Sequence, residues 1–263
     1  MIAPGRAHRP GAGHALIEPV TQQELDECPF CRGREDRTPP ETLRLPAGAE
    51  DWIVRVVPNL YPAIERQEVV IHSPEHKRSF AELTDEEIEL VAHAWLQRAS
   101  DGLDDGFGYV FPLINEGRAA GSSLPHAHSQ IALLREVPPG ARTLDPHGLE
   151  TILARNDLLV TEDGSSEAVA HPVGRLPYEL VIGGSADLGA HLRVLRTCIR
   201  KLRAVEGPVP WNAWLYGLSA GDKAASFMNV VPRLTILAGL ELGAGIYVNS
   251  LDPSEAAARL REA

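Results

Sequence analysis

The same order of secondary-structure patterns, strand, helix, strand, strand, occurs twice along this chain. Strand-like apolar runs lie at 68–74, 109–115, 128–134, 178–184, 211–217 and 226–233. A helical pattern follows the first run of each set of three. One supersecondary unit used twice predicts two similar lobes, each an antiparallel sheet with a helix packed on it. The expected fold class is α+β.

The helices are marked by start signals and by apolar periodicity. The stretch 83–100 contains Thr84 with Glu87 three residues later, which is a capping-box pattern. The stretch 185–207 carries leucine and isoleucine at spacings of four and three and ends at Gly207. A third, short helix is expected at 252–262, where Asp252 can cap the first turn.

A turn-rich segment, REVPPGARTLDPHG, separates the two copies. It predicts an amino-terminal lobe at 1–140 and a carboxy-terminal lobe at 141–263. The first lobe has His126-Ala127-His128 before a strand, whereas the second has Ala225-Ser226-Phe227. Because the second copy lacks the histidines, they are not needed to build such a lobe. This favours a chemical role for them.

Composition limits the classes of partner and compartment. The chain has 263 residues, a formal net charge of −11 and three cysteines. Without a basic stripe, binding to nucleic acid is not expected. The cysteine count argues against a disulfide framework. Neither a signal peptide nor a run of the ~20 apolar residues that span a membrane is visible. The interpretation is a cytoplasmic protein with no membrane partner.

Cys28 and Cys31 form a C-x-x-C pair in the stretch ECPFCRG. Two thiolates at this spacing can bind one tetrahedral zinc ion. A redox pair or two idle thiols are the alternatives, although the flanking residues lack a thioredoxin-like context. A zinc site needs two further ligands. His76 and His126 have suitable chemistry, but spacing alone does not select them from ten histidines.

His126, His128 and Gln130 alternate along an expected strand, so they would point to one face. Such a group of polar side chains suits a metal or a phosphate. His128 itself is open to three interpretations: a core histidine, a metal ligand or a nucleophile. Neutral imidazole attacks phosphorus well and leaves readily, which suits a covalent nucleotidyl carrier. The preceding NEGRAAGSS is either a loop that binds phosphate or a flexible hairpin.

Together, the motifs resemble those of the galactose-1-phosphate uridylyltransferase family. The matching pieces, in family order, are IAPGRAHRP, CPFCRGREDRTPPE, VVPNLYPAI, SPEH, NEGRAAGSSLPHAHSQ, VVPRLTILAGLELGAGIYVN and DPSEAAARLRE. The resemblance implies two lobes of the histidine-triad fold, a nucleotidyltransferase of carbohydrate and galactose metabolism, and a homodimer.

The resemblance also implies a role for each matching residue. His128 would be the nucleophile, and Gln130 would hold the phosphoryl oxygens. Zinc would be the cofactor, bound in a structural site with no open position. Its four ligands would be Cys28, Cys31, His76 and His126. Main-chain N–H groups of Gly121, Ser122 and Ser123 would stabilise phosphoryl charge. Further nucleotide-side contacts would come from Asn115, Arg6 and Asn59.

The expected reaction moves a nucleoside monophosphate from a nucleoside-diphosphate sugar to a sugar 1-phosphate, as in UDP-glucose–hexose-1-phosphate uridylyltransferases. Glutamine at position 130 only orients oxygens, which favours transfer over hydrolysis. Position 60 is Leu, where several uridylyltransferases have Asp, and Ala225-Ser226-Phe227 predicts no second metal. The alternatives are an ADP-glucose phosphorylase-like enzyme that uses inorganic phosphate, a dinucleotide hydrolase, and a non-catalytic nucleotide-binding protein.

Overall fold

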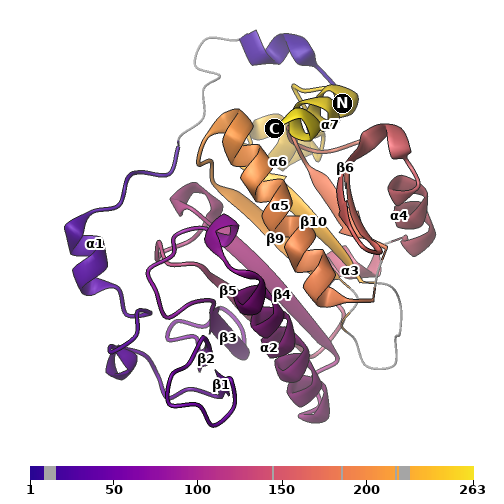
Figure 1. The fold of residues 1–263 in the computed structure, drawn as a ribbon. Helices are drawn as coiled ribbons and strands as arrows, with labels where there is room; N and C mark the ends of the chain where they lie inside the picture. Colours follow the sequence, from indigo (N-terminus) through magenta and orange to yellow (C-terminus); the bar gives the residue numbers. More distant parts are fainter. Residues whose placement is uncertain (9–15, 144, 185, 217, 219–225) are drawn as a thin grey trace.

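A single antiparallel sheet organises the computed structural model, which describes residues 1–8, 16–143, 145–184, 186–216, 218 and 226–263. In this part of the chain, ten strands are paired in the order β1-β2-β3-β5-β4-β9-β10-β8-β7-β6 (Figure 1). The strands are β1 (Leu43–Leu45), β2 (Val54–Pro58), β3 (Arg66–Ile71), β4 (Tyr109–Glu116), β5 (His128–Leu134), β6 (Leu159–Asp163), β7 (Ser166–Ala170), β8 (Leu180–Gly183), β9 (Trp211–Tyr216) and β10 (Phe227–Pro232).

Two long helices lie side by side across one face of the sheet (Figure 1). They are α2 (Asp85–Asp104) and α5 (Leu188–Glu206). Thr84 and Glu87 form the predicted capping box of α2, and Asp187 caps α5 through the N–H of Gly189. The shorter helices are α1 (Gln22–Glu27), α3 (Pro139–Arg142), α4 (Pro146–Leu153), α6 (Gly239–Ala244) and α7 (Pro253–Glu262), with 3-10 turns η1 (Pro4–His8), η2 (Glu35–Arg37), η3 (Phe80–Glu82), η4 (Arg118–Ala120) and η5 (Asn156–Leu158).

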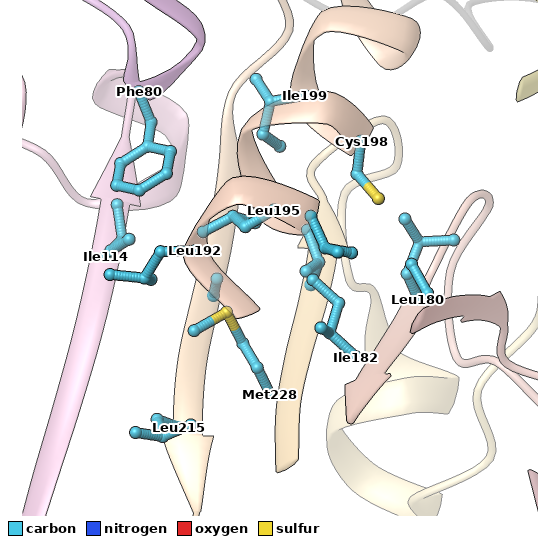
Figure 2. Close-up of a cluster of buried hydrophobic side chains, with 14 of the residues drawn as sticks. Phe80, Ile114, Leu180, Ile182, Leu192, Leu195, Cys198, Ile199, Leu215 and Met228 are labelled. Carbon is cyan, nitrogen blue, oxygen red and sulfur yellow. The ribbon is translucent and has the colours of Figure 1, made fainter. Parts of the chain in front are cut away.

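The main core fills the space between these helices and the sheet. Figure 2 shows Leu192 and Leu195 of α5 packed toward Met228 and Ile182 of the sheet. Burial alternates along β9, where every second residue from Trp211 onward is buried and the residues between are half-buried. Since neighbouring side chains in a strand point to opposite faces, the second face is left for other contacts.

A smaller cluster packs the C-x-x-C segment onto that second face. Cys28 and Phe30 are buried there against Val57 of β2 and against Val69 and Ile71 of β3. This apolar contact brings the cysteines close to the start of β5, where His126 and His128 lie. The candidate functional residues of the amino-terminal half therefore lie on the second face of the sheet.

The predicted α+β class is confirmed, and the two long helices and the last helix lie close to the expected positions. All six expected strands are present as β3, β4, β5, β8, β9 and β10. The sequence did not predict the shorter outer strands β1, β2, β6 and β7. Instead of separate sheets, the strands of both halves form one sheet joined at β4 and β9. The division at residue 140 stays a prediction.

A buried ion pair fastens α2 to the sheet. Arg98 donates from Nε and Nη2 to the two carboxylate oxygens of Glu68 in β3, both at 2.8 Å. Arg66 and Asp101 flank this pair.

No helix in the described residues is long and apolar enough to cross a membrane.

Replacing Glu68 by Ala should strongly destabilise the fold, because it leaves the Arg98 guanidinium buried beside fewer acceptors. We expect a loss of about 3 kcal/mol in the free energy of unfolding, measured by urea titration. Glu65→Ala is the matched control, since Glu65 pairs with Arg135 at the surface, with its side chain 57% exposed. It should change stability little. Equal losses in the two variants would contradict this assignment.

Candidate functional site

Two cysteines and two histidines from three separate segments converge into one cluster. The ligand atoms of Cys28, Cys31, His76 and His126 all lie within 4.8 Å of one another. Cys28 Sγ lies 3.3 Å from His126 Nδ1, and Cys31 Sγ lies 3.4 Å from His76 Nδ1 and 3.8 Å from His126 Nδ1. The structure therefore brings together the four predicted metal ligands.

Hydrogen bonds fix the orientation of both imidazole rings. His126 Nε2 donates to the carbonyl oxygen of Ser73 at 2.9 Å, and His76 Nε2 donates to Glu24 Oε1 at 2.8 Å. A carbonyl oxygen only accepts, so His126 carries its proton on Nε2. The Nδ1 lone pairs are thereby left facing the sulfur atoms. Such outer partners are typical of metal-binding histidines.

The donor set fits a tetrahedral zinc ion. Zinc–sulfur and zinc–nitrogen bonds of about 2.3 and 2.0 Å would place sulfur and nitrogen ligands roughly 3.5 Å apart, close to the separations observed. Burial and the neighbouring Cys28 raise the pKa of the Cys31 thiol to about 12, and burial lowers the pKa of His126 to about 3. A cation is the group that would stabilise a thiolate in such surroundings.

His128 is the first residue of β5 and is buried. Its Nδ1 donates to the main-chain carbonyl oxygen of His126 at 2.6 Å. In the described part of the chain, Nε2 makes no hydrogen bond and keeps its lone pair. Burial lowers the pKa of His128, which favours the neutral ring, while the bond to the carbonyl opposes part of this effect. The result is a neutral imidazole with one nitrogen held and the other available.

Contacts on both faces of β5 hold this histidine in place. Phe30 packs edge-on against His126 and His128, with ring centroids 5.8 and 5.5 Å away. On the helix side, Ser129 Oγ accepts from Trp95 Nε1 of α2 at 2.9 Å and pairs with His72 Nε2 at 2.8 Å. Because Ser129 points toward α2, His128 and Gln130 point to the opposite face.

Gln130 lies on that face with its amide orientation fixed by Gln67 of β3. The side-chain oxygen of Gln67 accepts from the N–H of Ala63 at 2.9 Å, which identifies that atom as the oxygen. The Gln67 NH₂ group therefore donates to the side-chain oxygen of Gln130. Gln130 must present its own NH₂ group on the other side.

Asn115 and the loop after it border the same small cavity as His128. Asn115 lies at the end of β4, and Gly117 and Ser122 also line that cavity. Gly121 has φ of +91°, a conformation that side chains rarely adopt. Its N–H donates to Arg118 O, and the N–H of Ser122 donates to Gly117 O. Contrary to expectation, these two main-chain donors are therefore used within the loop itself.

The remaining predicted contacts lie apart from this cavity. Arg6 is exposed in η1, and hydrogen bonds from Met1 and Ala3 to Tyr247 and Asn249 hold its segment. No contact among the described residues joins Arg6 to His128. Asn59 Oδ1 accepts from the N–H of Tyr61 at 3.0 Å, so it forms a local turn. Nucleotide binding by either residue stays a prediction, as it does for exposed Ser123.

In the second half, Phe227 opens β10 as His128 opens β5. The carbonyl of the preceding Ser226 accepts from His191 Nε2 at 3.0 Å. Ala225 lies outside the described residues, as does Arg9 of the RAHRP motif. The expectation that no second metal binds here stays a prediction.

Several supporting residues were not found by sequence reasoning. They are Glu24, Phe30, Gln67, His72, Ser73 and Asn212. Only Phe30 carried a local signal, since it lies between the two cysteines. The others contact the site through strand pairing or the course of the chain, which no short motif records.

Comparison with known proteins gives a family-model match and several relatives. Residues 62–138 match the family model of galactose-1-phosphate uridyl transferase, N-terminal domain. An ADP-glucose phosphorylase from Arabidopsis thaliana is 25% identical over 100% of this chain and 89% of its own. A galactose-1-phosphate uridylyltransferase from Streptomyces lividans is 33% identical over 40% of this chain and 29% of its own.

The fold has solved counterparts as well. The crystal structure of an ADP-glucose phosphorylase from Arabidopsis thaliana with bound ADP-glucose superposes with a TM-score of 0.83. It is 24% identical and covers 100% of this chain and 94% of the other. These matches confirm the family resemblance and the fold that the motifs predicted.

Purified protein that has not met a chelator should contain about one zinc ion per chain. Cys31→Ser should lower both zinc content and the thermal midpoint, since binding of a structural metal is coupled to folding. Elemental analysis and thermal unfolding give the two readouts. Cys198→Ser is the control, because Cys198 is a buried thiol of α5 outside the cluster. Full metal content in the Cys31 variant would refute the assignment.

Proposed function

We propose that this chain, which is related to the galactose-1-phosphate uridylyltransferase family, is a nucleotidyltransferase acting on nucleoside-diphosphate sugars. The observation that carries the proposal is the state of His128. Its ring is buried and favoured as neutral, with Nδ1 bonded to the His126 carbonyl and the Nε2 lone pair available. That is the form of histidine that attacks phosphorus.

In the first step, His128 Nε2 attacks the α-phosphorus of the nucleotide sugar. A phosphorus–nitrogen bond forms while the bond to the bridging oxygen breaks, and a sugar 1-phosphate leaves with the electron pair. In the second step, an oxygen of the acceptor phosphate attacks the same phosphorus, and the electrons of the phosphorus–nitrogen bond return to Nε2. The Nδ1–H bond to the His126 carbonyl stabilises the positive ring of the intermediate.

The amides beside His128 support transfer rather than hydrolysis. Gln130 has no proton to give to water or to a leaving group at neutral pH, whereas its NH₂ group can donate to a phosphoryl oxygen. A sugar 1-phosphate leaves without needing much protonation. Asn115, which borders the same cavity as His128, would supply a second amide donor.

Zinc, when bound, would supply structural order, because four protein ligands complete a tetrahedral site. His126 belongs to this cluster and also provides the carbonyl that holds His128. The cluster would thus orient the reactive ring without contacting the substrate.

Two donor and acceptor pairs are supported by different observations. Similarity to an ADP-glucose phosphorylase extends over 100% of this chain, which favours an ADP-sugar with inorganic phosphate as acceptor. Similarity to a uridylyltransferase extends over 40% of it. The family-model match at residues 62–138, which includes His128, likewise supports a UDP-sugar with a sugar 1-phosphate. We place the adenylyl reaction first.

A substrate panel separates the two reactions. ADP-glucose and UDP-glucose are each incubated with inorganic phosphate or a sugar 1-phosphate, and products are identified by mass spectrometry. ADP-glucose with phosphate should give ADP and glucose 1-phosphate at the highest rate. Exclusive turnover of UDP-glucose with a sugar phosphate would select the second reaction. An enzyme that turns over none of the four mixtures would count against the proposed function.

Incubation with the nucleotide sugar alone should add one nucleoside monophosphate to the peptide that carries His128. This adduct should be labile in acid and stable in base, as a phosphorus–nitrogen bond is. His128→Asn should lose the adduct and lower turnover by at least about 10³-fold, since the covalent route is closed.

His93→Asn serves as the control, because His93 lies exposed on α2. It should retain both adduct and turnover. Mapping of the adduct to another residue, or near-normal turnover in His128→Asn, would rule out the covalent mechanism.

A further inference from the structure

The two halves of the sheet meet beside the candidate site. Strand β4 from the first half pairs with β9 from the second, and Asn115 lies directly opposite Asn212 in this ladder. Both side chains are half-buried. Asn212 thus brings a side chain of the second half next to Asn115, which borders the same cavity as His128.

The amide of Asn212 has only one orientation that satisfies its neighbours. Its Nδ2 lies 2.7 Å from the carbonyl oxygen of Ala120, which can only accept a hydrogen bond. On the other side, Nη1 of Arg233, which can only donate, lies 3.4 Å from Oδ1. The unambiguous partners thus identify the nitrogen and the oxygen of this side chain.

That orientation determines the orientation of Asn115. Asn212 Nδ2 also donates to Asn115 Oδ1 at 2.7 Å, so the oxygen of Asn115 is turned toward β9. The Asn115 NH₂ group faces the loop instead, where a methyl group built on Gly121 would lie 3.9 Å from Nδ2. Asn115 consequently presents a donor, and not an acceptor, on the side of the loop around Gly121.

We propose that Asn212 is a positioning residue, which keeps the Asn115 amide turned so that its NH₂ group meets a phosphoryl oxygen of the substrate. The inference rests on the proposed function. A free asparagine can present its oxygen as easily as its nitrogen, and an oxygen would repel a phosphoryl group. By holding one orientation, Asn212 removes that unproductive state. The carboxy-terminal half thereby contributes to catalysis although it carries no histidine pair.

A second pair of amides, Gln67 and Gln130, shows the same arrangement on the other side of β5. Gln67 is fixed by the N–H of Ala63 and donates to the oxygen of Gln130, which leaves the Gln130 NH₂ group for the substrate. Two amides, one from β3 and one from β9, thus orient the two amides proposed to bind the phosphoryl group. Gln67 is accordingly assigned the same positioning role.

A double-mutant cycle tests the role of Asn212. Asn212→Ala, Asn115→Ala and the double variant are compared with wild type in kcat/KM for the nucleotide sugar, together with the thermal midpoint. Asn212→Ala should lower kcat/KM about tenfold, the value of one well-placed hydrogen bond. In the Asn115→Ala background it should lower kcat/KM less than about twofold, because nothing remains to be oriented. A role in stability alone would make the two losses multiply, and that result would overturn the proposal.

Two further variants sharpen the test. Asn212→Asp keeps the shape but cannot donate, so it should turn the Asn115 oxygen toward the substrate and reduce kcat/KM more than Asn212→Ala does. Wild-type rates in this variant would refute the assignment, whether or not the alanine variant folds. Asn229→Ala, in the adjacent strand opposite Trp214, is the matched control and should stay within about twofold of wild type.

The analogous cycle of Gln67→Ala with Gln130→Ala tests the second amide, with the same expected coupling. The wild-type enzyme separates the two levels of inference. If it turns over none of the nucleotide sugars, the proposed function is wrong. If it is active but both cycles give multiplicative losses, the proposed function stands and the positioning roles are wrong.

Discussion

The candidate site depends on one hydrogen bond, from His128 Nδ1 to the carbonyl oxygen of His126, at 2.6 Å. It decides which imidazole nitrogen carries the proton and which keeps its lone pair. The carbonyl belongs to a residue whose own ring lies in the cysteine and histidine cluster. A displacement of the His126 main chain would therefore move the acceptor that holds His128. The position of the cluster and the orientation of the His128 ring are therefore coupled through the main chain of residues 126–128.

Much of this arrangement could be predicted from the sequence, because the strongest patterns are local. The capping residues of α2 and the apolar spacing of α5 are read directly from neighbouring positions. The four convergent side chains of the cluster were predicted because Cys28 and Cys31 form a recognisable pair and the resemblance supplied the two histidines. Alternation in β5 also correctly placed His128 and Gln130 on one face.

The remaining features depend on pairings between distant segments. The outer strands β1, β2, β6 and β7 are short, and β1 has only three residues, so their apolar patterns carry little information. The link between Asn115 and Asn212 joins positions 97 residues apart and depends on the register of β4 with β9. The loop around Gly121 was expected to offer its N–H groups to a ligand, but turn formation competes for the same donors. A motif records residue types, and it does not show which hydrogen bonds are already satisfied.

The continuity of the sheet also affects how the chain could be divided. The four residues of the cluster and His128 all lie in the first half, which suggests that this half could act alone. Yet β4 pairs with β5 on one side and with β9 on the other. Separating the halves would expose the Leu113–Glu116 stretch of β4 as an unprotected edge open to pairing with other chains. Each half therefore protects the other from such pairing, because β9 covers the edge of β4 and β4 covers the edge of β9.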